Sequence, residues 1–458
     1  MQSNATFRSM LNEYMKQKGI NLHQFANKVG LNVGSLSYIL NGHRKVTIEQ
    51  LDMITEGLGE NKGLFYDQYF KEVLVEATPN WRRIKPFLLA CEEAGRLDLI
   101  QKSVELLLDN LMYSQVLFEM AENFFRNGQK EAARIIYENV ALSEKNQHSE
   151  RLALCQYRLF TCRLGINQEK NYQTAIQYEM FVDRLDGFNH LEALKDLANT
   201  YRSLRHWDKV EEIALKLKEK AEFYYQLKKP FDLEQEPVRP LFTYIAYSDL
   251  LLGSVYEARG DYLRALDFID LYSSLNWVKE EDESSLLWKN KFHVWAKVNK
   301  MATRIAAGDS TLFTEYLSYM ESNAEELLLA FLNVVSAANR YSINIDEIIR
   351  RMDIGQLVNI GSEENTYTRQ ITEERLARFY YELSYYYLNI HEYKGGFEYL
   401  IRSLEKSVSI NLKSRILNCV GLFEKFRDKS DVVTLSAYKN IIEGVYGNEN
   451  KTGDFLNF

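Results

Sequence analysis

Proline is almost missing from this sequence: the 458 residues contain 5, where roughly 5% usage would give about 23. Proline breaks helix interiors, because it lacks an N–H and its ring clashes with the preceding turn. A long chain that avoids it is therefore predicted to be mostly helical. The composition, 46% hydrophobic and 26% charged, excludes a disordered chain. The length exceeds what one core supports, so we expect at least two domains.

Cysteine and long apolar runs are also scarce. The four cysteines form no CxxC pair and no dense framework, so we expect no disulfides, no metal site and a reducing cytosol. The N-terminus lacks the apolar core of a signal peptide, and no run of 18 apolar residues is present. These absences predict a cytoplasmic protein without a membrane partner.

Signatures of catalysis are missing as well. The sequence contains no P-loop, no HExxH, no Gly-x-Ser-x-Gly and no Rossmann fingerprint. We therefore expect no enzymatic activity, no catalytic residue and no cofactor.

Charge is unevenly distributed along the chain. Residues 1–45 contain six lysines and arginines against Glu13 alone, whereas the whole chain carries a net charge of −8. A basic N-terminal segment on an acidic body suits a protein that contacts phosphate at one end, although chance surface charge would give the same count.

Four short helices are predicted in this basic segment. Hydrophobic residues at spacings of three and four indicate a helix over 4–18, which Gly19 ends. Asn21, Asn32 and Thr47 stand where the next three helices need an N-cap. Their inward faces would hold Leu22, Phe25, Ala26 and Val29, then Leu36, Ile39 and Leu40, and last Ile48, Leu51, Ile54 and Leu58. Short helices joined by tight glycine turns are typical of a helix-turn-helix.

The segment from Phe7 to about Leu58 resembles the lambda-repressor/Cro-like family. The resemblance rests on Phe25-Ala26, Val29-Gly30, Leu31, Leu36, Ile39 and the Asn41-Gly42 turn. It implies that the third helix reads the major groove of double-stranded DNA; the alternative is a small bundle used only for packing.

The DNA contacts that this resemblance implies fall into two groups. Base-edge readers would be Asn32, Val33, Ser35, Ser37 and Tyr38, and phosphate contacts would be His43, Arg44 and Lys45. Leu22 stands where many relatives have a phosphate-binding glutamine, and Gly34 weakens the reading helix by about 1 kcal/mol relative to alanine. Tight binding would therefore need two modules in a dimer.

A degenerate pattern of helix pairs follows, similar to the tetratricopeptide repeat. The clearest copies span 117–140, 191–217, 244–272 and 378–404, with small residues where two helices meet and aromatic residues between them. This pattern predicts a right-handed solenoid whose concave face binds an extended peptide. By register, that face would present Lys195, Asn199, Arg202, Tyr247, Ser254, Glu257, Arg378 and Tyr381, with Asn333 and Asn339 as further candidates.

Together, the two halves resemble the RRNPP group of Gram-positive peptide-sensing regulators, and the order of elements is similar to that of the phage arbitrium receptors. The resemblance implies an all-α cytosolic homodimer that binds an operator and senses a short signalling peptide (quorum sensing). The alternative is a Rap-like interaction scaffold with little DNA binding. The predicted domains are 1–66 (helix-turn-helix), 67–83 (connector), 84–372 (peptide-binding solenoid), 373–445 (dimerisation or capping) and 446–458 (a loose tail).

Overall fold

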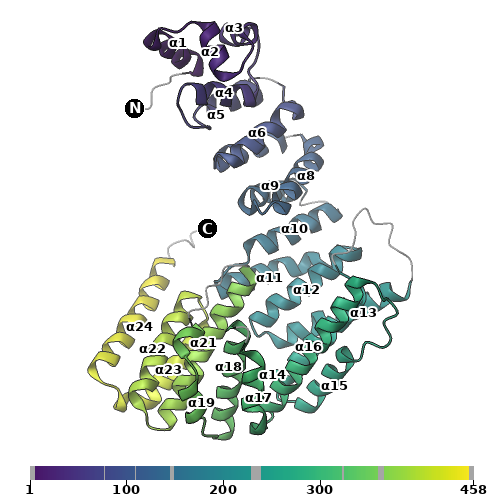
Figure 1. Cartoon of the computed structure of the whole chain (residues 1–458), viewed down its shortest axis with the longest axis vertical. Coiled ribbons are helices and arrows are strands. Elements are labelled where there is room, and N and C mark those ends of the chain that lie inside the picture. The colour runs from purple at the N-terminus through teal and green to yellow at the C-terminus, as the bar shows by residue number, and fades with distance from the viewer. Residues whose placement is uncertain are drawn as a thin grey trace. The chain divides into compact units, whose positions relative to one another are not determined.

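The computed structural model describes residues 6–76, 78–108, 110–144, 149–227, 239–321, 324–358 and 366–452. Throughout these ranges the secondary structure is helical, without a strand, as the scarcity of proline predicted (Figure 1). None of the helices in them is both long and apolar enough to cross a bilayer. The chain divides into two compact units, residues 1–162 and 163–458. This division does not coincide with the predicted domain limits.

The first unit begins with four short helices and continues with longer ones. Its helices are α1 Phe7–Lys18, α2 Leu22–Val29, α3 Val33–Leu40, α4 Ile48–Gly57, α5 Tyr66–Phe70, the π-helix η1 Lys71–Val75, α6 Trp81–Glu93, α7 Leu97–Leu108, the 3-10 turn η2 Leu111–Tyr113, α8 Ser114–Arg126, α9 Lys130–Ser143 and α10 Glu150–Arg163.

The predicted caps of the N-terminal module are confirmed. The side chains of Asn21, Asn32 and Thr47 each accept a hydrogen bond from a backbone N–H in the first turn of α2, α3 and α4. Gly19 and Gly30 end α1 and α2 in the left-handed conformation, which glycine adopts without a Cβ clash. Local sequence therefore sets where each helix begins and ends.

The core of the module is formed by residues that the sequence periodicity placed inward. Fully buried side chains are Phe7, Leu11, Phe25, Ala26, Leu36, Ile39, Leu51 and Ile54. An additional close contact involves Gly57 at the end of α4: a Cβ there would overlap the side chain of Val29. The module thus packs α2 against α4 with no space for a larger residue.

The first part of the predicted connector, up to Val75, is helical and packs on the module. Tyr66 in α5 donates a hydrogen bond of 2.9 Å from its hydroxyl to Asp52 of α4. Gln68 of α5 accepts a bond of 3.1 Å from the backbone N–H of Phe7, and Glu72 of η1 is bound by Arg8 of α1. The chain after α4 is therefore part of the module rather than a free linker.

The second unit contains α11 Gln168–Val182, α12 Gly187–Ser203, α13 Trp207–Gln226, α14 Phe242–Ala258, α15 Tyr262–Ser273, α16 Glu283–Ala306, η3 Ser310–Leu312, α17 Phe313–Met320, α18 Ala324–Tyr341, α19 Asp346–Arg351, α20 Ile354–Val358, α21 Thr366–Asn389, α22 Tyr393–Ser409, α23 Lys413–Phe426, η4 Arg427–Lys429 and α24 Val432–Thr452.

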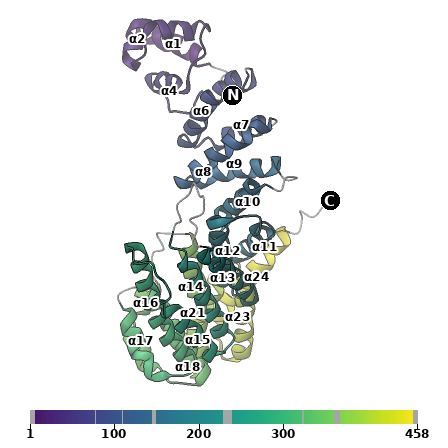
Figure 2. The ribbon, with the colours of Figure 1, turned by 90° about the vertical axis from the view of Figure 1, so that its right-hand side faces the viewer.

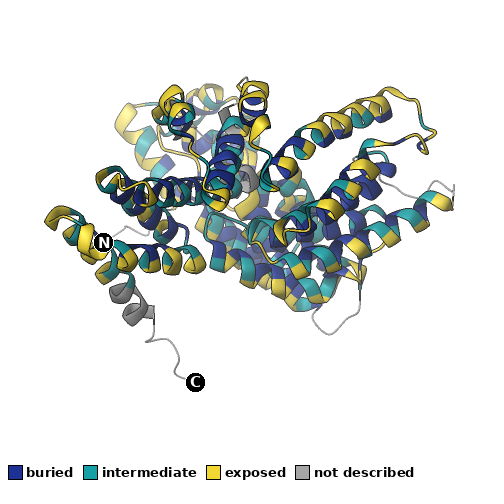
Figure 3. Cartoon of the chain, turned by 90° about the horizontal axis from the view of Figure 1, so that it is seen from below, coloured by how far each residue is buried: buried dark blue, intermediate teal, exposed yellow. Residues whose placement is uncertain are grey.

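Successive helices pack in pairs, as the repeat pattern predicted. In the second unit, α12 lies beside α13 and α14 beside α15, and α8 and α9 pair likewise in the first unit (Figure 2). The helices α21 and α22 form a further pair (Figure 1). Most of these helices bury one face and expose the other (Figure 3). The helix α14 is buried along most of its surface. The result is a helical solenoid.

Two details of the second unit differ from the expected pattern. The helices α16 and α21 are each 24 residues long, too long for half of a regular 34-residue repeat. The segment 446–458 was expected to be a loose tail, yet α24 continues through it to Thr452; residues 453–458 lie outside the described part of the chain. The polar sequence after Tyr446 contains no proline, so nothing local stops the helix there.

Candidate nucleic-acid interface and solenoid cavity

The helix α3 presents a polar outer face. Asn32 and Tyr38 are exposed, with 60% of the Tyr38 surface accessible, and Ser35 and Ser37 are half-buried. The side-chain carbonyl of Asn32 accepts the 3.2 Å cap bond from Ser35 N, which leaves its amide NH2 to donate. Val33, in the first turn, is half-buried as well. All five predicted base readers are thus accessible on α3.

The predicted phosphate contacts lie in the loop after α3. His43, Arg44 and Lys45 are all exposed. The ring of His43 packs edge-on against that of Tyr38, and Lys45 donates a 3.0 Å bond from Nζ to the backbone carbonyl of Glu72. Lys45 forms no ion pair among the described residues, although its charge helps to lower the pKa of Glu72.

Two other cations of the basic segment are engaged within the module. Lys28 donates bonds of 2.6 and 2.7 Å to the Tyr14 hydroxyl and the Gly57 carbonyl. Arg8 forms an ion pair with Glu72 at 2.8 Å. The charge excess counted along the sequence therefore overstates what the module can offer to phosphates.

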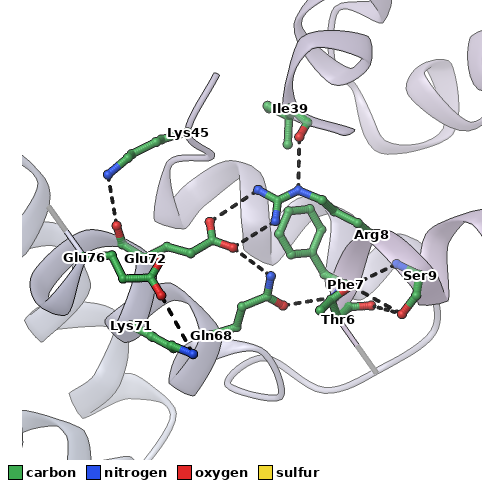
Figure 4. A network of polar contacts seen from close by, with 10 residues as sticks. All are labelled: Thr6, Phe7, Arg8, Ser9, Ile39, Lys45, Gln68, Lys71, Glu72 and Glu76. Atoms are coloured by element: carbon green, nitrogen blue, oxygen red, sulfur yellow. Dashed lines mark hydrogen bonds and ion pairs between the residues drawn. The ribbon is translucent and has the colours of Figure 1, made fainter. Parts of the chain in front are cut away.

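Arg8 and Glu72 form the centre of a polar network behind α3 (Figure 4). The guanidinium of Arg8 contacts both Glu72 carboxylate oxygens, at 2.8 and 3.3 Å, and its Nε donates a 3.2 Å bond to the carbonyl of Ile39 near the end of α3. Burial by itself would raise the pKa of Glu72, but hydrogen bonds from Arg8 and Gln68 outweigh it, and the pKa is lowered. Through Arg8, the connector fixes the end of α3.

A cavity of about 240 Å³ lies within the second unit. Most of its lining comes from α12, α14, α16, α18 and α21, of which α12, α14 and α21 are the first members of the pairs described above. Its lining includes Arg202, Ser254, Glu257 and Arg378, which the repeat register assigned to the concave face, and Asn333, which was a further candidate. The second helices of the pairs contribute fewer residues to it.

The other five predicted groove residues lie elsewhere and are engaged within the fold. Lys195 is buried and paired with Glu192 and Asp196. Asn199 accepts a 2.6 Å bond from the Tyr247 hydroxyl, Asn339 donates to Glu382, and Tyr381 packs under the guanidinium of Arg415. At these positions, the helix face that was predicted to line the groove packs within the fold instead.

Sequence reasoning missed several residues of the cavity. The most informative are Arg205, Glu374 and Arg375, which add charge to the lining. A signal was present for Arg205: it stands one residue after the cap of α12, in the turn where the copies at 117–140 and 244–272 have Gly128 and Gly260.

The profile of the helix-turn-helix family matches residues 11–64. The match extends from α1 to the residues just before α5, so it identifies the N-terminal module as a helix-turn-helix and indicates a DNA-binding transcriptional regulator rather than an enzyme family. It does not extend to the solenoid. A search among proteins of curated function found no match to the chain.

Proposed function

We propose that the protein is a cytosolic, homodimeric DNA-binding regulator whose operator affinity is controlled by a short signalling peptide held in the solenoid. The observation that carries the proposal is the helix-turn-helix module with an accessible polar face on α3 and the exposed cations Arg44 and Lys45 beside it. The cavity lined mostly by α12, α14, α16, α18 and α21 supports the peptide part.

In this mechanism α3 enters the major groove. The free amide donors of Asn32 and the hydroxyls of Ser35 and Ser37 meet base edges, while Arg44 and Lys45 contact phosphates on either side. Because few cations remain available, one module binds weakly. Two modules in a dimer, on half-sites about 34 Å apart, supply the required affinity.

The dimer contact is proposed in the C-terminal helices, within 373–445. Large apolar side chains are exposed there, namely Leu417, Val432 and Val433, with Val432 84% accessible. Exposed apolar surface of this kind is typical of an interaction site.

A peptide that binds one arrangement of the solenoid better than another then shifts the population of dimers able to span both half-sites, in proportion to its differential affinity.

A gel-shift titration tests the DNA part. The full chain is titrated onto the duplex upstream of its own gene, at several salt concentrations, and specific retardation with two protomers per site is expected. Arg44→Ala and Lys45→Ala should each reduce the slope of log affinity against log salt by about 0.9, the effect of one lost phosphate contact. Lys62→Ala, which removes an exposed cation paired with Glu56, is the matched control and should leave the slope unchanged.

Salt-insensitive or sequence-independent binding in this assay would contradict the proposal that the protein is a DNA-binding regulator. The peptide part is tested on the same complex with the low-molecular-mass fraction of spent culture medium. Operator affinity should change when this fraction is added, and the change should disappear after protease treatment. An unchanged affinity would leave a constitutive DNA-binding protein and refute the peptide control.

A further inference from the structure

The cavity of the second unit is rich in arginine. Four of its lining residues are arginines, Arg202, Arg205, Arg375 and Arg378, and two are glutamates, Glu257 and Glu374. Within the described part of the chain, the guanidiniums of Arg202 and Arg205 form no ion pair and no hydrogen bond; Arg205 only packs against the ring of Trp207, at 5.2 Å. The cavity therefore has an excess of positive charge.

Neither glutamate compensates the arginines fully. Glu257 accepts a 2.6 Å bond from the Thr303 hydroxyl, and its removal from bulk water raises its pKa. Oε1 of Glu374 is 3.9 Å from Nε of Arg378, beyond hydrogen-bond range, and this buried oxygen has no hydrogen-bond partner among the described residues. The two glutamates thus leave guanidinium N–H groups of the arginines without a hydrogen-bond acceptor in the described part of the chain.

The backbone at Arg205 shows that an arginine is held here at a conformational cost. Its φ is +61°, in the left-handed region that side chains with a Cβ rarely adopt. At the same place in other turns stand Gly95, Gly128, Gly260 and Gly308, all with positive φ. Arg205 thus takes a position that glycine would occupy without strain, as Ser342, His391 and Asn411 do in their own turns.

The environment of Arg205 favours a negative partner. Its side chain is exposed to solvent at the cavity. Desolvation by the surrounding protein and repulsion from Arg378 and Arg415 outweigh the attraction of Glu374 and Glu257, and the pKa of Arg205 is lowered to about 10. An anion placed among these guanidiniums would relieve the repulsion and satisfy the free donors.

We propose that this cavity is an oxyanion site, in which the free guanidiniums of Arg202 and Arg205, with Arg378, bind the acidic group of a ligand. The volume of about 240 Å³ is below that of pockets for whole drug-sized ligands, so the cavity holds one acidic group and its immediate substituents. The carboxylate of the proposed peptide and a free inorganic anion share this chemistry. That the anion is a peptide carboxylate rests on the proposed function, whereas the anion site itself does not depend on it.

The variant Arg205→Gly tests the site without endangering the fold. Glycine adopts φ near +60° readily, so the turn is preserved or stabilised while the guanidinium is removed. His391→Gly is the matched control, because His391 also has a positive φ of 66° in an exposed turn and does not line the cavity.

Binding is measured by calorimetry on the full chain without DNA, at low salt. The probes are inorganic phosphate, acetyl-glycyl-glycine with a free carboxylate, and the C-terminal amide of that compound. At least one anionic probe should bind the wild type saturably and the amide should not. Arg205→Gly should lower the affinity about 10- to 100-fold, the effect of losing a charge-assisted hydrogen bond, while His391→Gly leaves it unchanged.

Binding of acetyl-glycyl-glycine alone, or of both anions, supports a peptide carboxylate as the ligand. Binding of phosphate alone supports an anion site but contradicts a peptide carboxylate as its ligand. Absence of saturable binding, or equal affinity in Arg205→Gly, overturns the site. Because no DNA is present, failure here is distinguishable from failure of the regulator proposal.

Discussion

Removing Arg8 should loosen the reading helix without touching its DNA-facing surface. Arg8→Ala deletes the bonds to the Ile39 carbonyl and to both oxygens of Glu72, and leaves that carboxylate about three-quarters buried without its cation. Hydrogen bonds to charged groups contribute about 1.5–3 kcal/mol when buried, and partial exposure reduces this. We take about 2 kcal/mol as the expected loss.

Amide hydrogen exchange of the full chain, followed by mass spectrometry on a peptide covering α3, measures this loss directly. If the module opens as a unit, a loss of about 2 kcal/mol accelerates exchange in α3 about 30-fold. Arg44→Ala is the matched control: its guanidinium reaches only the Ser35 hydroxyl, at 3.5 Å, so it should weaken DNA binding and leave exchange unchanged. Exchange in Arg8→Ala within twofold of the wild type would refute the reasoning that Arg8 fixes the end of α3.

Two further predictions concern the stability of the molecule. Gly57→Ala should destabilise the module by about 1–3 kcal/mol in urea denaturation, because the new Cβ overlaps Val29 in a packed core. Gly421→Ala, in open space on α23, is the control and should be neutral or stabilising by up to about 1 kcal/mol. Equal effects of the two substitutions would contradict the packing argument. The pKa of Glu72 is lowered in the folded state from 4.5, so its carboxylate contributes stability that is present above about pH 4.5 and is lost as the pH falls through the folded pKa. Glu72→Gln should therefore be less stable than the wild type at pH 7, and the difference should shrink below pH 4.5; a difference that is independent of pH would show that charge plays no part.

The two halves of the proposed mechanism depend on different kinds of contact. The reading helix is held by short hydrogen bonds to α1 and the connector, so its position follows the state of residues 66–75. The cavity is built from the ends and faces of helices distributed over residues 202–378. Under the proposed mechanism, a ligand in this cavity would contact several of these helices at once.

Sequence alone determined the local features of this protein. The helical class follows from the scarcity of proline, and the limits of α2, α3 and α4 follow from Asn21, Asn32 and Thr47, because a cap depends on residues two or three positions away. The helix pairs follow from periodicity and turn residues for the same reason. Five of the ten predicted groove residues line the cavity. Register, which fixes the face of a helix approximately, placed four of these, namely Arg202, Ser254, Glu257 and Arg378.

The contacts between residues far apart in the sequence were decided by the tertiary structure. Arg8 meets Glu72 across 64 positions, and the count of basic residues could not reveal that its charge is taken. Lys195 and Asn199 share a helix face with Arg202, yet the packing of α14 against α12 engages Asn199 through Tyr247, while Lys195 pairs with its neighbours Glu192 and Asp196. Arg205 joins the site because a strained turn places it beside arginines from α21, a proximity that no local pattern specifies.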